Sequence, residues 1–503
     1  MESYRQNIDI TYKDEPLFLG NEFVGKEKKI IELPKFEDIK EKLPSPVWER
    51  HETAVNAYYK AWEIAFSNIA NPPENSLMTT PFIDTAFNGN LFMWDSAFIL
   101  MFAKYGSHVF NFQETIDNFY ALQHRDGFIC REIIETTGTD RFTRFDPSAT
   151  GPNIFPWCEW EYYKMYNDKD RVRKIFPVLA AYHRWLKEFA TWRDGSYRAS
   201  GFACGMDNLP RVMPEYNMMF SHGHMVWIDT CFQQILSCDM LINMGEVIGR
   251  DTEEFKAEKE HLAKYINKNL WDEVDGFYYD LWKNGKLNKV KTVASFWGLL
   301  TDAVPKERME KLISHLENEN EFKRPHRVPT LSYDHPDYKA ENGYWQGSVW
   351  APTNYMILRG LTKQGYHTLA REIAVNHYEN MLCSFEKTGT FWENYAPEFI
   401  GRGTNTKDFI GWTGLIPIAE LIEYIFGIQC LDKAHIVWRI NCTEKHGIKN
   451  YPIGGGFVTL ICEERTDAYE KPKITVETDL PINVEYIWDG GHENQNSKNT
   501  ASW

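Results

Sequence analysis

"RVRKIFPVLAAYHRWLKEFA", residues 171–190, is the stretch that decides the fold class. Its hydrophobic residues recur every three or four positions, at Ile175, Leu179, Tyr182, Leu186 and Phe189. This spacing places them on one face of an amphipathic helix. The same pattern predicts further helices at 45–70, 225–249, 368–382 and 413–428. In the first of these, Pro46 is expected in the opening helical turn, where a proline costs no hydrogen bond.

Short turn-rich segments separate the expected helices. Asp-Gly pairs stand at 126–127, 194–195 and 275–276, each followed by aromatic residues. Asp-Gly favours tight turns because glycine adopts positive φ without strain. Helices punctuated by such turns predict an all-α-dominated chain in which six helical hairpins close into an (α/α)6 toroid.

The pattern of hydrophobic and turn-forming residues divides the chain into three regions. Residues 1–45 are expected to be an extended N-terminal segment, and 46–430 the helical catalytic domain. From 431 to 503 the sequence turns β-rich, with alternating stretches such as "HIVWRI" and "NVEYIWDG". We expect a small β-rich C-terminal domain there, ending in a polar, frayed tail from residue 492.

Composition limits the classes of partner. The net charge is −16, which disfavours nucleic acid, while 18 tryptophans and 26 tyrosines suit a thick core or an aromatic cleft. The nine cysteines include no CxxC pair, so neither a disulfide framework nor a zinc site is expected. No apolar stretch is long enough for a membrane span or signal peptide, which predicts a cytoplasmic protein unless a leader has been removed. Nothing indicates a cofactor or a metal.

Four segments combine carboxylates, aromatics and glycines. They are "FMWDSAF" (92–98), "SGFACGMDNLPR" (200–211), "NGYWQGSVWAPTNY" (342–355) and "TFWENYAPEF" (390–399). Such mixtures suit sugars, because pyranose faces stack on indole rings while their hydroxyls need charged or amide partners. The segments therefore predict a carbohydrate site, with Arg131 and Gln346 as further hydroxyl ligands.

Glycoside hydrolysis requires two carboxyl groups on opposite sides of the scissile bond. Asp207 and Glu393 are the two candidates, and only a closed fold brings residues so far apart in sequence together. A structural reading stays open for each. Asp207 precedes Asn208-Leu209-Pro210 and suits a helix cap or Asx-turn, and Glu393 suits a hydrogen-bonded interfacial glutamate. Asp95 is likewise either a helix-capping residue or a ligand of sugar hydroxyls.

The order of these motifs resembles a known family. WDS, GMDN, YWQGSVW, WENY and GW follow one another as in the (α/α)6-barrel inverting glycosidases of the clan that holds trehalases and family 63 hydrolases. The likeness covers roughly residues 50–428 and is greatest to family 63 and mannosylglycerate-hydrolase-like enzymes. It implies that Asp207 is the general acid, Glu393 the general base, and Trp94 with Asp95 part of the sugar subsite.

The resemblance has one departure that bears on substrate. Gln346 stands where the family's YWRGPVW segment has arginine, which weakens the expectation of a charged aglycone such as glycerate. We expect an inverting exo-α-glycosidase acting on an α-linked glucoside or mannoside. Four indoles are expected to wall its pocket: Trp345, Trp350, Trp392 and Trp412.

Two other functions remain open from the sequence. A sugar epimerase or isomerase on a similar barrel would need a base at a ring carbon, for which His222, His224 or His335 are candidates. A non-catalytic carbohydrate-binding protein would bind sugar without needing both carboxylates. Neither the sugar, the linkage nor the oligomeric state follows from the sequence.

Overall fold

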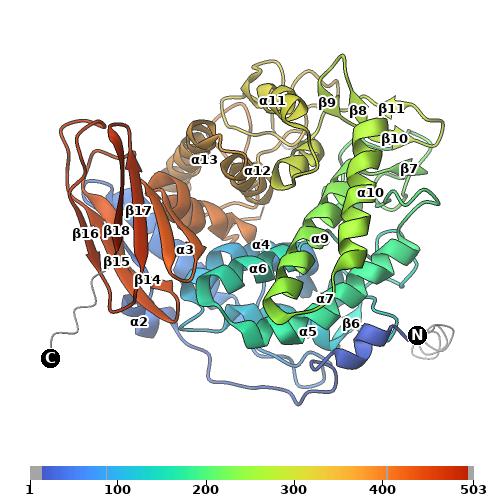
Figure 1. The fold of residues 1–503 in the computed structure, drawn as a ribbon, viewed down its shortest axis with the longest axis horizontal. Helices are drawn as coiled ribbons and strands as arrows, with labels where there is room; N and C mark the ends of the chain where they lie inside the picture. The colour runs from blue at the N-terminus through green and yellow to red at the C-terminus, as the bar shows by residue number, and fades with distance from the viewer. Residues whose placement is uncertain (1–13, 86–87, 342, 404–405, 497–503) are drawn as a thin grey trace.

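A computed structural model describes residues 14–85, 88–341, 343–403 and 406–496. The protein is rich in helices, and a region of β-strands follows them at the C-terminal end (Figure 1). This confirms the predicted helical class and the predicted C-terminal strands. No helix in the described part of the chain combines the length and apolar character needed to span a bilayer.

Six helical segments contact one another in a closed circuit. They are α4 (Met93–Ala103), α6 (Phe155–Tyr166), α9 (Ile228–Ile248), η5 (Val293–Leu300), α12 (Ala351–Lys363) and η7 (Trp412–Leu415), which continues as the π-helical η8 (Ile416–Ile425). Along this order each segment contacts the next, and η7 returns to α4. All eleven residues of α4 and all ten of η8 are buried, as expected for helices surrounded by other elements.

Further helices pack on the outside of this circuit. They include α3 (Glu52–Ser67), α5 (Asp117–Ala121), α7 (Lys169–Phe189), α10 (Glu253–Asn269), α11 (Lys306–Ser314) and α13 (His367–Thr388). In Figure 1, α9 and α10 run side by side, and α13 lies against α12. The predicted helix at 171–190 is α7, whose N-terminus is capped by the Asp168 carboxylate at 2.9 Å from the Arg171 amide.

Buried charges close one end of the circuit. Lys104, just after α4, lies 3.3 Å from Glu423 in η8 and 3.9 Å from Glu161 in α6. Arg359 in α12 reaches the same Glu161 at 2.8 Å. The cluster therefore ties together the C-terminal halves of four inner segments, while their N-terminal ends lie at the opposite end.

Short connections carry small strands and turns. Three short helical segments, η1 (Pro16–Gly20), α2 (Phe36–Ile39) and η2 (Lys40–Lys42), interrupt the otherwise irregular N-terminal stretch. Near the site, β4 (Asn90–Phe92), β5 (Glu132–Ile134) and β6 (Thr139–Asp140) form a three-stranded sheet. The glycines of the three Asp-Gly pairs all have positive φ, between +66° and +95°, as the turns predicted from sequence require.

Two four-stranded sheets form the C-terminal region, on the left in Figure 1. One has the order β12–β13–β17–β18 and the other β1–β14–β15–β16. Their bounds are β12 (Ile428–Asp432), β13 (His435–Arg439), β14 (His446–Ile453), β15 (Gly456–Cys462), β16 (Ile474–Glu477), β17 (Asn483–Trp488) and β18 (Gly491–Asn496). The tail expected to fray from residue 492 thus begins as β18, because it pairs with β17, and residues 497–503 lie outside the described part.

The strand β1 (Ser45–Trp48) corrects one prediction from sequence. Pro46 was expected in the first turn of a helix, but residues 45–48 pair antiparallel with β14, Ser45 opposite Lys449. The helix α3 begins only at Glu52. The pairing partner lies about 400 residues away, which a local helical pattern cannot reveal.

Candidate active site

The lone carboxylate of "FMWDSAF" lies in the first turn of an inner helix. Strand β4 ends at Phe92, and α4 begins with Met93, so Asp95 is the third helical residue and not the N-cap. Asp95 is 6% exposed, in a helix that is otherwise free of charge. Aspartate is rarely this buried unless it is paired or functional. Asp95 lines a cavity.

A cavity of about 270 Å³ lies at the N-terminal ends of α4 and η7, beside the residues that precede α6. Its described lining residues are Asn88, Phe92, Trp94, Asp95, Arg131, Glu132, Arg141, Phe142, Gly151, Pro152, Phe202, Gly205, Asp207, Tyr344, Trp345, Glu393 and Trp412. Both proposed carboxyl groups, Asp207 and Glu393, are among them, although 186 positions separate them in the sequence. Five of the eight residues predicted to bind substrate also line it: Trp94, Asp95, Arg131, Trp345 and Trp412.

The other three predicted residues do not line this cavity. Trp350 lies behind Trp345, with the two indoles stacked at 3.9 Å and an interplanar angle of 2°. It also meets Trp412 edge-on at 5.6 Å, so it supports two lining indoles. Trp392 instead packs under the guanidinium of Arg402.

Gln346 is the third. Its backbone carbonyl accepts from the Lys339 amide at 2.8 Å, within a tight turn. The side chain is half-buried outside the described wall of the cavity. Alternation along "YWQGSVW" does not reveal which residues face inward, because this segment is an irregular turn and not a strand.

Tyr344 is a lining residue that the sequence reasoning missed. Its backbone has φ +57°, a left-handed conformation that is uncommon outside glycine. A hydrogen bond from Tyr344 lowers the pKa of Asp207, although burial raises that pKa more. Strained residues cluster at functional sites, but the strain has no signature in the sequence, where Tyr344 is one aromatic among several.

The environments of the two carboxyl groups raise both pKa values. Burial raises the pKa of Asp207 to about 7, against Arg131, whose positive charge lowers it. The pKa of Glu393 is also raised to about 7, chiefly by burial and also by the Asp207 charge, against a hydrogen bond with Thr406 that lowers it. Both carboxyl groups therefore titrate near neutral pH, where one can be protonated while the other is ionised.

Asp95 is coupled to the same pair. Burial raises its pKa well above the usual range, the Glu393 charge adds to the shift, and Arg131 opposes it. A desolvated carboxyl that is close to other carboxyls in a cavity marks a functional site. The cavity thus concentrates acidic groups that are poorly solvated until a ligand enters.

Hydrogen bonds hold the loops that carry these groups. The Asn208 side chain donates to the Gly343 carbonyl at 3.1 Å and accepts from the Trp345 amide at 2.8 Å. The Trp412 indole donates to the Glu393 carbonyl at 3.1 Å. The segment that carries Asp207 is therefore linked directly to Trp345, and Glu393 is linked directly to Trp412. No helix starts after Asp207, which rules out the capping role considered from sequence.

A buried ion cluster anchors the segment that follows Asp207. The Arg211 side chain, 2% exposed, binds Asp229 through two bonds of 2.7 and 2.8 Å. It binds Asp280 through two more, at 2.8 and 2.7 Å. The bidentate bonds fix the orientation of the Arg211 side chain relative to both carboxylates. Removing any one of the three charges would leave a partner buried without its counter-charge, which is costly.

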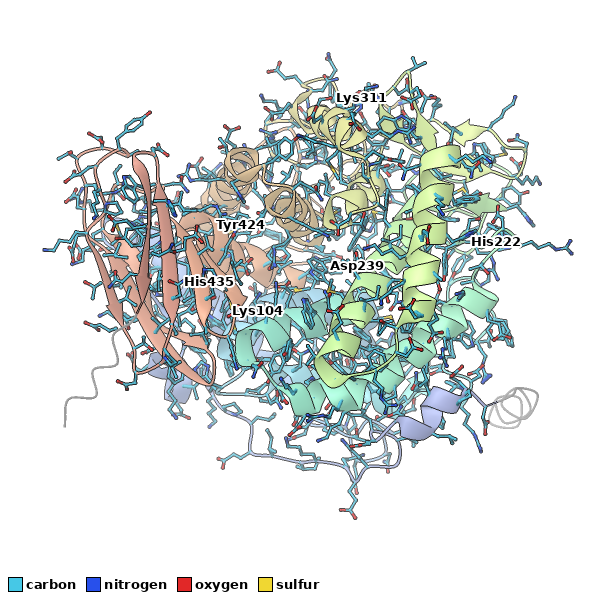
Figure 2. All side chains as sticks on the ribbon, in the orientation of Figure 1. Lys104, His222, Asp239, Lys311, Tyr424 and His435 are labelled. Carbon is cyan, nitrogen blue, oxygen red and sulfur yellow. The ribbon has the colours of Figure 1, made fainter. Side chains whose placement is uncertain are left out.

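Histidines stand apart from the cavity. His222 lies at the side of the molecule away from the C-terminal sheets (Figure 2) and packs against Trp192. Among the described lining residues there is no histidine, and neither His224 nor His335 is one of them. The geometry gives no support to a histidine base acting at a sugar ring.

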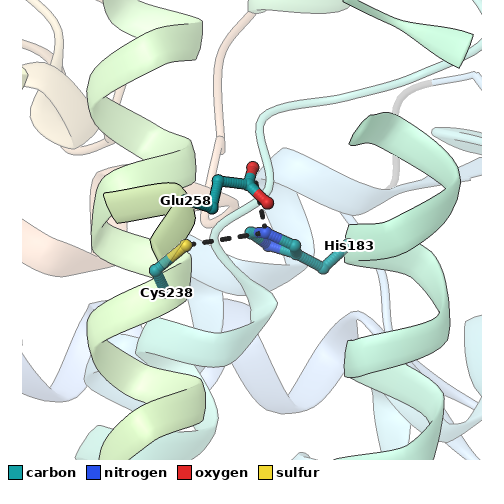
Figure 3. Close-up of side chains that lie close together, drawn as sticks. All are labelled: His183, Cys238 and Glu258. Atoms are coloured by element: carbon teal, nitrogen blue, oxygen red, sulfur yellow. Dashed lines mark hydrogen bonds and ion pairs between the residues drawn. The ribbon is translucent and has the colours of Figure 1, made fainter. Parts of the chain in front are cut away.

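One group of side chains in the described residues has a metal-like composition. His183, Cys238 and Glu258 lie close together between α7, α9 and α10 (Figure 3). The imidazole lies 3.3 Å from Glu258 and 3.6 Å from the Cys238 sulfur. Glu258 also pairs with Lys187 at 2.9 Å. The group satisfies its own polar atoms and lines no part of the cavity.

Comparison with known proteins agrees with this site. A family model described as "Mannosylglycerate hydrolase MGH1-like glycoside hydrolase domain" matches residues 89–413, more than half of the chain. An uncharacterized protein of Borreliella burgdorferi is 28% identical over 73% of this chain and 79% of its own length.

Two further relatives carry functional names. A probable mannosyl-oligosaccharide glucosidase of Schizosaccharomyces pombe is 26% identical over 49% of this chain, and the match spans only 34% of that longer protein. The crystal structure of a GH63 mannosylglycerate hydrolase from Thermus thermophilus in complex with glucose aligns over 72% of this chain and 99% of its own, with a TM-score of 0.58 and 22% identity. That likeness shows a shared fold.

The match to this family model over more than half of the chain shows a glycoside hydrolase. The chain belongs to the family of the mannosylglycerate hydrolase MGH1-like glycoside hydrolase domain.

Proposed function

We propose that the protein is an exo-acting, inverting α-glycosidase that hydrolyses an α-linked glucoside or mannoside. The observation that carries the proposal is that Asp207 and Glu393 line one cavity, each with its pKa raised to about 7. One carboxyl group can then be protonated while the other is ionised at the same pH, as general acid and general base require.

Each lining group has a proposed role. Asp207 donates its proton to the glycosidic oxygen, and Tyr344 orients it. Glu393 takes a proton from the water that attacks the anomeric carbon from the opposite face. Trp94, Trp345 and Trp412 offer indole surfaces to the sugar ring, while Asp95 and Arg131 bind hydroxyl groups. Trp350 acts indirectly, by supporting the indoles of Trp345 and Trp412.

The arrangement of helices supports both the toroid and the exo mode. We propose that the six inner segments and their outer partners within residues 46–430 form an (α/α)6 barrel, with the strand region as an accessory domain. The N-terminal ends of α4 and η7 lie at the cavity, whereas the ion cluster of Lys104, Glu161 and Glu423 occupies the other end. Because buried charges fill the end away from the cavity, we expect the cavity to accept the end of a glycan and not its middle.

A panel of α-linked glucosides and mannosides tests the proposal, with NMR following the anomer that is released first. We expect the β-anomer to appear first, as inversion requires. Asp207→Asn and Glu393→Gln should each lower kcat by about 10²–10⁴-fold on an unactivated substrate while binding persists. Near-normal turnover in either variant, or initial release of the α-anomer, would contradict the assignment.

A further inference from the structure

The cations of the cavity wall lie on the side of the proposed acid. Among the described lining residues, the cations are Arg131 and Arg141. Arg131 lies against the ring of Phe202, which belongs to the same segment as Asp207, and Arg131 pairs with Glu132 at 3.0 Å. A general acid stands beside the leaving group, so Arg131 and Glu132 face the aglycone.

Glu132 pairs with Arg131 and lies near Arg141, whose side chain is 58% exposed to solvent. One carboxylate oxygen accepts from Arg131 at 3.0 Å, and the other lies 4.0 Å from Arg141. Asn90 donates to Glu132 at 2.8 Å and holds it in this position. The Glu132 side chain is 7% exposed and that of Arg131 13%, so water screens this pair poorly. A carboxylate on the substrate would have to compete with the Glu132 carboxylate for the Arg131 guanidinium.

Aromatic rings continue the same wall toward the surface. Phe142 and Phe202 lie on the Arg131 guanidinium, with ring centroids at 4.9 and 5.0 Å. Phe202 meets Phe220 edge-on at 4.9 Å, and Phe220 is 47% exposed. Apolar ring faces that run from a cavity to the exterior suit the apolar faces of successive sugar units.

We propose that the leaving group of the substrate is a neutral sugar, and that Glu132 sets this preference by cancelling the charge of Arg131 in a buried pair. The inference rests on the proposed hydrolysis. Arg131 keeps N–H donors for hydroxyl groups, while its net attraction for a carboxylate is lost. The Phe202–Phe220 wall then takes the second sugar of the leaving group.

Matched substrates test the role of Glu132. The wild type and Glu132→Gln are compared at pH 7 on an α-linked disaccharide and on the α-glycoside of glycerate with the same sugar. We expect the wild type to favour the disaccharide in kcat/KM, and Glu132→Gln to shift the ratio toward glycerate by about tenfold or more, because an uncompensated arginine attracts carboxylate. Glu464→Gln, in an exposed pair with Arg50, should leave the ratio unchanged.

A second variant tests the wall without disturbing buried charge. Phe220→Ala should raise KM for a trisaccharide about fivefold or more while leaving that for a disaccharide unchanged, since stacking on one ring contributes about 1 kcal/mol. Phe457→Ala, 45% exposed and in β15, is the matched control.

The outcomes separate the two proposals. A wild type that prefers the glycerate compound, or a Glu132→Gln variant with an unchanged ratio, overturns the inference and leaves the hydrolase assignment intact. Equal effects of Phe220→Ala on both sugars overturn the extended wall. Hydrolysis of neither substrate class overturns the proposed function, and the inference with it.

Discussion

The side chain of Asn208 and the backbone of Trp345 are joined by a 2.8 Å hydrogen bond, which links the residue after the proposed acid to an indole on the cavity wall. The same side-chain amide donates to the Gly343 carbonyl. One side chain therefore sets the distance between two segments that are about 135 residues apart in the sequence. The placement of Asp207 against Tyr344 depends on this link.

Replacing Asn208 by alanine should lower kcat/KM by about 10–100-fold, because small displacements of a catalytic group are costly. Unfolding free energy should fall by only about 1–3 kcal/mol, the value of two lost hydrogen bonds. Asn376→Ala is the matched control, since Asn376 likewise accepts from an amide, of Arg327, and donates to a carbonyl, of Pro325. It lines no part of the cavity. Equal losses of activity in the two variants would contradict the positioning role.

The raised pKa values predict a bell-shaped pH dependence of kcat/KM centred near neutrality. Activity falls at high pH as Asp207 loses its proton, and at low pH as Glu393 gains one. A glycosyl fluoride needs no protonation of its leaving group, so Asp207→Asn should retain substantial activity on it. The basic limb should then disappear while the acidic limb remains. Loss of the acidic limb instead would reverse the two roles.

The ionised carboxylate of Asp95 should lower the stability of the folded protein. Its folded pKa is raised, so the folded state binds the proton more tightly than the unfolded state does. Stability attributable to this group is therefore present below about pH 4, the unfolded pKa, and is lost as the pH rises. Asp95→Asn should raise Tm at pH 7.5 by about 2 °C, with little gain at pH 4, and should abolish turnover.

Asp194 provides the opposite case for the same measurement. Burial raises its pKa, but hydrogen bonds from Ser196 outweigh that effect and lower it overall. Asp194→Asn should therefore lower Tm at pH 7.5. A fall in Tm for Asp95→Asn, at pH 7.5 and not at pH 4, would show that the Asp95 carboxylate is stabilised and not strained.

Arg211 should be needed for the fold around Asp207. Arg211→Met leaves Asp229 and Asp280 buried without their partner and should lower the unfolding free energy by about 3–5 kcal/mol. Adding Asp229→Asn and Asp280→Asn should recover part of the loss, because the unpaired charges are then removed. Denaturant unfolding measures both steps. A triple variant less stable than Arg211→Met would contradict a charge-based explanation.

Local patterns predicted the helices well. The apolar faces at 171–190 and 225–249 correspond to α7 and α9, and the strands after residue 431 also appear where alternation indicated them. These features depend on neighbours within a few positions, so the sequence displays them directly. The strand around Pro46 was missed because its partner, β14, is remote.

The site was predictable in its chemistry and less so in its geometry. Carboxylates flanked by aromatics and glycines indicated Asp207 and Glu393, and the cavity contains both. Which of two nearby tryptophans faces the sugar was not predictable: Trp345 lines the cavity while Trp350 stacks behind it. Tyr344 was missed because its left-handed backbone conformation exists only in the folded chain. Glu132 was missed because its ion pair with Arg131 is likewise visible only in the structure.

The pairing of β1 with β14 has a consequence for biosynthesis. Ser45 leaves the ribosome about 400 residues before Lys449, its partner in the sheet. At about 5–20 residues per second, the early strand waits roughly 20–80 seconds for the edge it completes. The nascent helices must therefore assemble beside an unsatisfied strand, and a ribosome that stalls late leaves that strand free to capture another chain.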